Sequence, residues 1–141
     1  RYLVGADAWL IASVGTVTVL GHMFPAYIQF RGGKGVAAGL GALAIISPIS
    51  AMIALSGVII ALVSKFVSLG SIIGTSLSLG ALIIFSAFEF RIGMWDHDRW
   101  YLLFAIPVSI LIIWSHQANI ERLTKGDESK LENKATPRRA Q

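Results

Sequence analysis

Four long stretches without any aspartate, glutamate, lysine or arginine dominate the hydrophobic pattern of this chain. They cover residues 8–30, 35–64, 66–88 and 100–120. A helix needs about 20 predominantly apolar residues to cross the hydrocarbon core of a bilayer, and each stretch reaches that length. The pattern therefore predicts an integral membrane protein made of helices.

Prolines and glycines divide these stretches into individual helices. The 35–64 stretch would form a helix of about 45 Å, which is longer than one span requires. Ser47-Pro48 lies inside it, and proline removes a helical hydrogen bond and disfavours helix at the preceding residue. We expect two short helices joined there, with one kinked helix as the alternative. The predicted helices cover residues 8–23, 36–46, 49–64, 69–90 and 100–117, followed by an amphipathic segment over 120–130.

These elements predict an all-α fold, a polytopic membrane helical bundle with about five transmembrane helices. Residues 1–130 form one membrane-embedded domain, and residues 131–141 form a polar, disordered cytoplasmic tail. With five crossings, nine of the twelve lysines and arginines fall on one side of the membrane and three on the other. A single crossing over 35–64 gives eight and four. The positive-inside rule favours five crossings, with the glycine-rich loop, the 65–71 segment and the tail in the cytoplasm.

Composition agrees with this assignment and narrows the function. Hydrophobic residues make up 55% of the chain and charged residues 14%, whereas soluble domains contain about 25% charged residues. A soluble domain, a disordered chain and a nucleic-acid-binding protein are therefore excluded. The net charge of +4 is better explained by orientation and contact with anionic lipid. The absence of cysteine excludes disulfides, thiolate metal sites and cysteine nucleophiles.

The first candidate site is the glycine-rich loop Gly32-Gly33-Lys34-Gly35, which follows Gly21-His22-Met23-Phe24-Pro25. Glycines let backbone N–H groups approach an anion, Lys34 adds positive charge, and the next helix contributes its dipole. Together these features predict a phosphate or carboxylate site. The alternative is a membrane turn with a snorkelling lysine. The loop is not a Walker A motif, because Ile28 and Gly35 stand where that motif needs glycine and serine or threonine.

Two further polar clusters fall on the same predicted side. In the first, Ser68 and Ser71 either donate hydrogen bonds to a substrate or cap a helix, and capping is favoured. In the second, His116 and Asn119 lie on one helical face, where a histidine can orient or deprotonate a hydroxyl. Arg122 and Lys130 can hold phosphate oxygens. The alternative for this second cluster is an ordinary interfacial amphipathic helix.

The segment Asp96-His97-Asp98 lies on the opposite side of the predicted membrane. It lacks further candidate ligands, so we interpret it as a solvated turn and predict no metal site.

Two motifs resemble those of a known family. Residues 21–37 closely resemble the second motif of the bacterial acyl-phosphate:glycerol-3-phosphate acyltransferases, the PlsY family. Residues 116–130 resemble their third motif, with the spacing His116-x-x-Asn119-Ile120-x-Arg122-Leu123-x-x-Gly126-x-Glu128-x-Lys130. Residues 65–72 resemble the intervening serine loop. The family's first motif, a Gly-Ser-Gly-Asn run after an arginine, is absent. The resemblance implies that this chain corresponds to the C-terminal two-thirds of a seven-helix protein.

The resemblance also implies an activity. The 1-hydroxyl of sn-glycerol 3-phosphate would attack the carbonyl of a fatty acyl phosphate, giving lysophosphatidic acid and inorganic phosphate. It implies an enzyme that uses no cofactor, metal or nucleic acid, in the bacterial inner (cytoplasmic) membrane with its site facing the cytoplasm. Membrane lipids and the enzyme that produces acyl phosphate are the expected partners.

The resemblance assigns roles to particular residues. It implies catalytic roles for His116, Ser68 and Asn119, with His116 or the substrate's own phosphate as the base. Substrate phosphate binding is expected from Gly32, Gly33, Lys34, Gly35, His22, Arg122, Glu128 and Lys130. The alternative function is a small transporter or binding protein for phosphate-bearing anions. Transporters commonly contain matched broken helices in inverted repeats, whereas only the 35–64 stretch is broken here.

Overall fold

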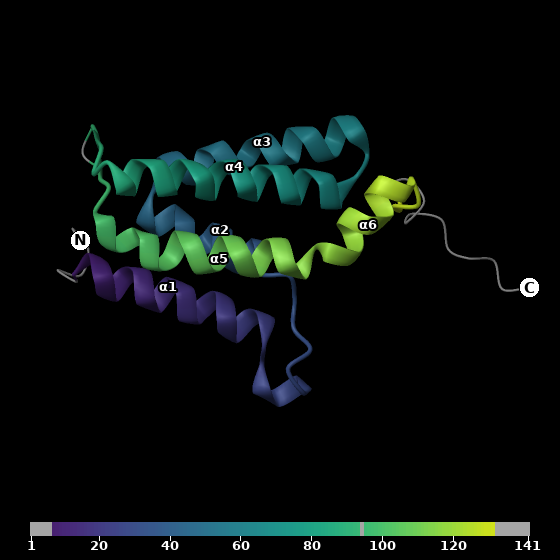
Figure 1. Cartoon of the computed structure of the whole chain (residues 1–141), viewed down its shortest axis with the longest axis horizontal. Coiled ribbons are helices and arrows are strands. Elements are labelled where there is room, and N and C mark those ends of the chain that lie inside the picture. The colour runs from purple at the N-terminus through teal and green to yellow at the C-terminus, as the bar shows by residue number, and fades with distance from the viewer. Residues whose placement is uncertain (1–6, 94, 132–141) are drawn as a thin grey trace, which may run out of the picture.

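The chain forms a bundle of helices that run back and forth along one axis (Figure 1). The structure is a computed structural model and describes residues 7–93 and 95–131. Its helices are α1 (Ala8–Met23), α2 (Val36–Ile46), α3 (Pro48–Ser64), α4 (Val67–Ala87), α5 (Leu102–Ser115) and α6 (Gln117–Lys125). Short 3₁₀ turns, η1 (Ala26–Ile28) and η2 (Arg99–Tyr101), and a hairpin of β1 (Arg91–Ile92) and β2 (Trp95–Asp96) complete it. The predicted helical bundle is confirmed.

The predicted break at Ser47-Pro48 separates two helices. Ser47 ends α2 in an extended conformation, and its side chain accepts a hydrogen bond from the backbone N–H of Ser50. Pro48 occupies the first position of α3, where its missing N–H costs nothing. The alternative of a single kinked helix is therefore wrong.

This reversal brings the polar segments together at one end of the bundle. Helices α1 to α5 alternate in direction and α6 continues from the end of α5, so the glycine-rich loop before α2, the α3–α4 turn and α6 all lie at one end (Figure 1). The start of α1 and the β1–β2 hairpin lie at the other end. We call these the glycine-loop end and the hairpin end.

Several helix boundaries differ from the prediction: α3 begins one residue early and α4 two residues early, and α4 and α5 both stop early where the chain turns. α4 stops at Ala87, and Glu89 then adopts a left-handed backbone conformation (φ 52°) that leads into the hairpin. α5 begins after η2 and stops at Ser115. His116 separates it from α6, whose axis is bent by 51° from the preceding helical segment.

The number of membrane crossings stays a prediction. Among the described residues, the segment Ala8–Ile28 and α4 are long and apolar enough to span a bilayer, and the bent α5–α6 pair would be a third span. Helices α2 and α3 are apolar but shorter, with 11 and 17 residues. At about 1.5 Å per residue, α2 reaches only about 16 Å and does not cross the hydrocarbon core alone.

Small residues let α3 and α4 approach at backbone distance. A Cβ added to Gly57 of α3 would lie 2.4 Å from the carbonyl oxygen of Gly70, and one added to Gly70 would lie 2.2 Å from that of Gly57. Around Phe104 of α5, fully buried side chains from other helices, including Val19 and Leu82, form the core. Packed in this way, α4 and α5 support the polar segments of the chain.

The interpretation of residues 96–98 as a solvated turn is wrong for His97. Its side chain is only 2% exposed, and both ring nitrogens are within hydrogen-bonding distance of other residues. Asp96 does lie at the surface, where it pairs with Arg91, and Asp98 caps η2 through the N–H of Trp100. The predicted tail over 131–141 lies, apart from Leu131, outside the described residues.

Candidate functional site

Side chains from all three predicted polar clusters meet at the glycine-loop end. Lys34 Nζ donates a hydrogen bond to Asn119 Oδ1, which joins segments 85 positions apart. Ser68 Oγ donates to Glu128 Oε1 at 2.6 Å. The clusters therefore form one site, built by α2, α4 and α6 with the segment that follows α6.

The glycine-rich loop packs tightly against the end of α1. The N–H groups of Gly32 and Gly33 donate to the carbonyl oxygens of Met23 and His22, at 3.2 and 3.3 Å. A Cβ on Gly32 would lie 2.2 Å from the His22 carbonyl oxygen, and one on Gly33 would lie 2.5 Å from His22 Nε2. These two glycines thus serve close approach to α1. Because their N–H groups already have acceptors, the capacity for an anion rests on Lys34 and the start of α2.

Lys34 stands where α2 begins. Gly35 is the N-cap of α2, with φ 81°, a conformation that glycine adopts without strain. The backbone carbonyl of Lys34 accepts a hydrogen bond from Ser115 Oγ at 3.1 Å. The lysine ammonium and the helix N-terminus therefore lie together, and both favour a negatively charged ligand.

Glu128 organises the opposite wall of the site. Its carboxylate accepts hydrogen bonds from Ser68 Oγ, from Asn119 Nδ2 at 2.8 Å and from Arg122 Nε at 2.7 Å. The hydrogen bond from Ser68, followed by those from Asn119 and Arg122, lowers the pKa of Glu128 to about 2. The carboxylate is therefore charged at neutral pH, and its side chain is only 9% exposed.

This arrangement corrects one prediction and refines another. Ser68 does not cap α4, because Phe66 is the N-cap and makes no side-chain cap bond. Arg122 and Glu128 pair with each other, an arrangement that sequence analysis did not foresee. Asn119 uses both ends of its amide, since Oδ1 faces Lys34 and Nδ2 faces Glu128. It thereby links the glycine-rich loop to the charged wall.

His116 lies at the junction of α5 and α6 and is 2% exposed. Its Nδ1 is 2.8 Å from the carbonyl oxygen of Ile112. A carbonyl oxygen only accepts hydrogen bonds, so Nδ1 carries the proton of the neutral ring and Nε2 carries the lone pair. The His116 carbonyl also accepts from the N–H of Asn119 at 2.9 Å. The geometry thus fixes the tautomer that has a basic Nε2.

Two residues differ from the prediction for the site: Lys130 contacts an aromatic ring, and Ser115 was not among the predicted residues. Lys130 Nζ lies 5.9 Å from the centre of the Phe66 ring, a cation–π contact at the α3–α4 turn. Next to it, the N–H of Leu131 donates to the carbonyl of Lys65 at 2.8 Å. Ser115 was not predicted as a site residue, and its hydroxyl donates a hydrogen bond to the Lys34 carbonyl. Its only sequence signal was a polar residue at the end of an apolar stretch, directly before His116.

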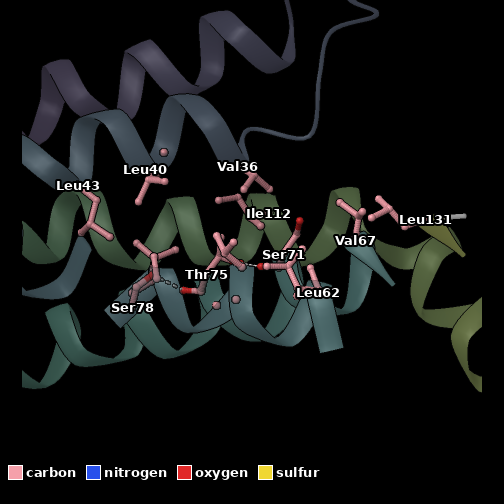
Figure 2. A pocket seen from close by; sticks show the side chains of 18 residues that line it. Val36, Leu40, Leu43, Leu62, Val67, Ser71, Thr75, Ser78, Ile112 and Leu131 are labelled. Atoms are coloured by element: carbon pink, nitrogen blue, oxygen red, sulfur yellow. Dashed lines mark hydrogen bonds between the residues drawn. The ribbon is translucent and has the colours of Figure 1, made fainter. Parts of the chain in front are cut away.

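An apolar cavity of about 280 Å³ lies between α2, α3 and α4 and extends to the α3–α4 turn (Figure 2). Val67 and Leu131 line it near the α3–α4 turn, and Leu43 and Ser78 line its opposite part. The hydroxyls of Thr75 and Ser78 donate to backbone carbonyls of their own helix, so they leave the wall effectively apolar. The cavity can hold a hydrocarbon chain.

No group of three or more histidine, cysteine, aspartate or glutamate side chains is positioned to hold a metal ion within residues 7–93 and 95–131. The charged partners in the site are lysine, arginine and one glutamate. This set suits an anionic ligand bound directly by the protein.

Comparisons with known proteins agree with the motifs. The glycerol-3-phosphate acyltransferase family matches residues 1–126. A glycerol-3-phosphate acyltransferase of Halalkalibacterium halodurans is 36% identical over 129 residues, covering 91% of this chain and 60% of the relative. One from Shewanella sp. (strain ANA-3) is 39% identical over 141 residues, covering 97% of this chain and 62% of the relative. The chain thus spans about three-fifths of the length of these relatives.

Two solved structures share the fold. One is PlsY (YgiH), an integral membrane glycerol 3-phosphate acyltransferase, in its glycerol 3-phosphate form, with TM-score 0.78 and 34% identity over 94% of this chain and 64% of that one. The other is its lysophosphatidic acid form, with TM-score 0.76 and 35% identity over 90% of this chain and 60% of that one. Sequence motifs, site and fold lead to the same conclusion: this chain belongs to the glycerol-3-phosphate acyltransferase family.

Proposed function

We propose that this chain forms the larger part of an acyltransferase that uses acyl phosphate. The reaction transfers a fatty acyl group to the 1-hydroxyl of sn-glycerol 3-phosphate and yields lysophosphatidic acid and inorganic phosphate. The single observation that carries the proposal is the Lys34–Asn119 hydrogen bond, since it unites the two motifs on which the family resemblance rests. Family membership and the PlsY fold add support.

The chemistry of both substrates matches the site. Each substrate carries a phosphate, and Lys34 with the N-terminus of α2 supplies positive charge and a favourable dipole for one of them. The Ser68–Glu128–Arg122 wall keeps Asn119 oriented for contact with substrate. The acyl chain requires an apolar channel next to these polar groups, and the cavity between α2, α3 and α4 offers one.

In the proposed step, the 1-hydroxyl oxygen bonds to the acyl carbonyl carbon while the bond from that carbon to the phosphate oxygen breaks. Phosphate leaves with the bonding electrons. His116 Nε2 accepts the hydroxyl proton, because hydrogen bonding of Nδ1 to Ile112 leaves Nε2 as the basic nitrogen. The Lys34 ammonium stabilises negative charge that develops on the phosphate and the carbonyl oxygen.

The cellular setting follows from the same proposal. The lysine- and arginine-rich glycine-loop end faces the cytoplasm of a bacterium, and the helices lie in its inner membrane. Glycerol 3-phosphate arrives from the water phase. The acyl phosphate comes from a separate enzyme that acts as partner.

A direct assay tests the proposal. Purified intact protein carrying this chain is mixed in detergent with acyl phosphate and glycerol 3-phosphate, without ATP or acyl-CoA, and lysophosphatidic acid is measured. Product formation supports an acyltransferase. A transporter for phosphate-bearing anions forms no product in this assay, and that result would reject the proposal.

Lys34→Ala tests the anion site. Loss of a charge-assisted hydrogen bond donor, worth about 1.5–3 kcal/mol, should raise KM for a phosphate-bearing substrate by roughly 10- to 100-fold. Lys125→Ala is the matched control, because the one ion pair of Lys125 with the described residues is an exposed pair with Glu121. Unchanged KM for both substrates in Lys34→Ala would remove the lysine from the mechanism.

His116→Gln tests the base. Loss of a positioned general base should lower kcat by about 10²- to 10⁴-fold while KM changes little. Retention of kcat within a few-fold of the parent would exclude His116 and assign proton removal to the phosphate of the substrate.

A further inference from the structure

A second buried polar cluster lies at the hairpin end, far from the site. His97 Nε2 is 2.9 Å from Ser47 Oγ, and His97 Nδ1 is 2.9 Å from the carbonyl oxygen of Phe90. Ser47 Oγ is also 3.0 Å from Ser50 Oγ. The two serines are fully buried and His97 nearly so. The His97 ring packs on Phe85, with 5.1 Å between ring centres. The proposed reaction uses none of these groups.

The cluster connects the hairpin to α2. Ser47 is the residue that ends α2, whereas His97 follows β2 and is tied to α4 through Phe85. The carbonyl of Phe90 only accepts, so Nδ1 donates to it and Nε2 is left to bind Ser47. His97 thus fixes the hairpin end of α2 to α4, the longest helix of the bundle.

α2 needs such a connection because its surface gives little resistance to sliding. Six of its eleven residues are glycine or alanine (sequence VAAGLGALAII), so its side chains form only shallow ridges for packing against neighbouring helices. Its buried side chains near the hairpin end are Leu43 and Ile46. Smooth apolar contact holds a helix laterally but specifies its position along the axis weakly, whereas hydrogen bonds are directional.

The position of α2 matters to the site because Lys34 and Gly35 lead directly into it. Ser47 lies twelve positions after Gly35, a distance of about 18 Å along the helix. A helix transmits an axial shift from one end to the other as a rigid rod. Displacement of Ser47 would therefore move Lys34 relative to Asn119.

We propose that His97 is a positioning residue for the glycine-rich loop: by holding Ser47, it sets the axial position of α2 and so the place of Lys34 opposite Asn119. This positional statement does not depend on the reaction. Its kinetic consequence rests on the proposed function, and the two are measured separately below.

Three substitutions at His97 distinguish the contributions of its two side-chain hydrogen bonds. His97→Phe keeps an aromatic ring against Phe85 and removes both bonds. His97→Asn keeps an amide donor near the place of Nδ1, for the Phe90 carbonyl, but does not reach Ser47. His97→Gln places an amide near the position of Nε2 and retains the contact with Ser47. We therefore expect α2 to keep the parent position in His97→Gln, and to be displaced alike in His97→Phe and His97→Asn.

Spin-label distances measure the position of α2 directly. The chain has no cysteine, so Ala37→Cys on α2 and Leu103→Cys at the hairpin end of α5 provide two labelling sites within it; both residues are exposed. The Ala37–Leu103 distance should shift or broaden by about 3 Å or more, two residues of helical rise, in His97→Phe and His97→Asn. The control pair Leu103→Cys and Ile120→Cys, which lies outside α2, should not change.

The outcomes are distinct. An Ala37–Leu103 distance that stays unchanged in all three variants overturns the proposal. If the His97 variants do not fold, Ser47→Ala removes the same hydrogen bond from the other side. It should give the same shift, and Ser47→Thr, which keeps the hydroxyl, should not. An unchanged distance in folded Ser47→Ala also overturns the proposal.

Kinetics then tests the consequence for the site. KM for glycerol 3-phosphate or acyl phosphate should rise about tenfold in His97→Phe and His97→Asn, the effect of one misplaced charge-assisted contact, with kcat within twofold. His97→Gln should restore KM. Loss of folded protein alone would lower the apparent kcat and leave KM unchanged, and this result without a distance shift counts against positioning. A distance shift with unchanged KM would instead contradict the phosphate-binding role of Lys34 in the proposed function.

Discussion

The two ends of the bundle are both closed by buried polar side chains, yet they use different chemistry. At the glycine-loop end, Lys34, Arg122 and Glu128 carry charge, and Arg122 still has 46% of its side chain exposed. At the hairpin end, the buried cluster contains two serines and His97 but no carboxylate, lysine or arginine. Charged pairs there, such as Arg91–Asp96, stay at the surface.

The difference reflects the cost of burial. Removing a charge from water costs several kcal/mol unless partners compensate, so a charged cluster forms where water still reaches part of it. Neutral hydroxyls and an imidazole cost less to bury when they bond to one another. The charged groups at the glycine-loop end therefore suit a negatively charged ligand, whereas the neutral cluster at the hairpin end links helices to one another. Substitutions at the two ends test this difference.

Among substitutions that compare the two ends without removing a proposed catalytic group, the largest effect is expected for Gly32→Ala at the glycine-loop end. The new Cβ would lie 2.2 Å from the backbone oxygen of His22, which cannot rotate away, so the loop must move. A misplacement of about 1 Å can cost about 100-fold in rate, and we expect a loss of this size in kcat/KM. Gly41→Ala on α2 is the control, because nothing lies within 4 Å of its added Cβ. Equal activity of the two variants would contradict a tightly placed loop.

A smaller, pH-dependent effect is expected for Glu128→Gln. Because the pKa of Glu128 falls from its ordinary value near 4.5 to about 2 in the folded chain, the folded state binds fewer protons. The stabilisation is fully present above pH 4.5 and is lost as the pH falls towards 2. The melting temperature of the parent in detergent should decline over this range, and Glu128→Gln should lose that part of the decline.

Glu121→Gln is the matched control for this titration, since Glu121 forms an exposed pair with Lys125 that contributes little. A Glu128→Gln variant with the same acid profile as the parent would show that the carboxylate does not stabilise the glycine-loop end.

The smallest effect, of opposite sign, is expected for Ser86→Ala near the hairpin end. Ser86 Oγ is buried and makes no hydrogen bond with the described residues. Removing an unsatisfied hydroxyl should stabilise the fold by about 1 kcal/mol. Ser78→Ala, which deletes a hydroxyl bonded to the Thr75 carbonyl, should not stabilise. Destabilisation by Ser86→Ala in chemical unfolding would mean that this hydroxyl has a partner.

Local features of the sequence predicted most of the fold. The bounds of α1 and α2 and the break at Ser47-Pro48 follow from proline and from the limits of apolar stretches, which act within a few residues. Their correct placement sufficed to bring the glycine-rich loop and Asn119 to the same end. The early stop of α4 was missed, because it depends on the backbone turn at Glu89 rather than on a change in hydropathy.

The pairings within the polar clusters were not predictable in the same way. Ser68 is hydrogen-bonded to Glu128, 60 positions later in the sequence, and Ser47 to His97, 50 positions later. Nothing near Ser68 distinguishes a hydroxyl that caps a helix from one that binds a distant carboxylate. His97 stands between two aspartates, which made it resemble a surface residue. Such partners become known only when helix packing fixes which ends of the bundle meet.

The bend at His116 has a consequence for access. α6 is bent by 51° from the preceding helical segment, so its polar residues extend sideways at the end of the bundle, while Val67 and Leu131 line the apolar cavity near the α3–α4 turn. A molecule with an ionic head and an oily tail can therefore lie across this boundary with each part in its preferred surroundings. Neither part has to cross the medium that suits the other.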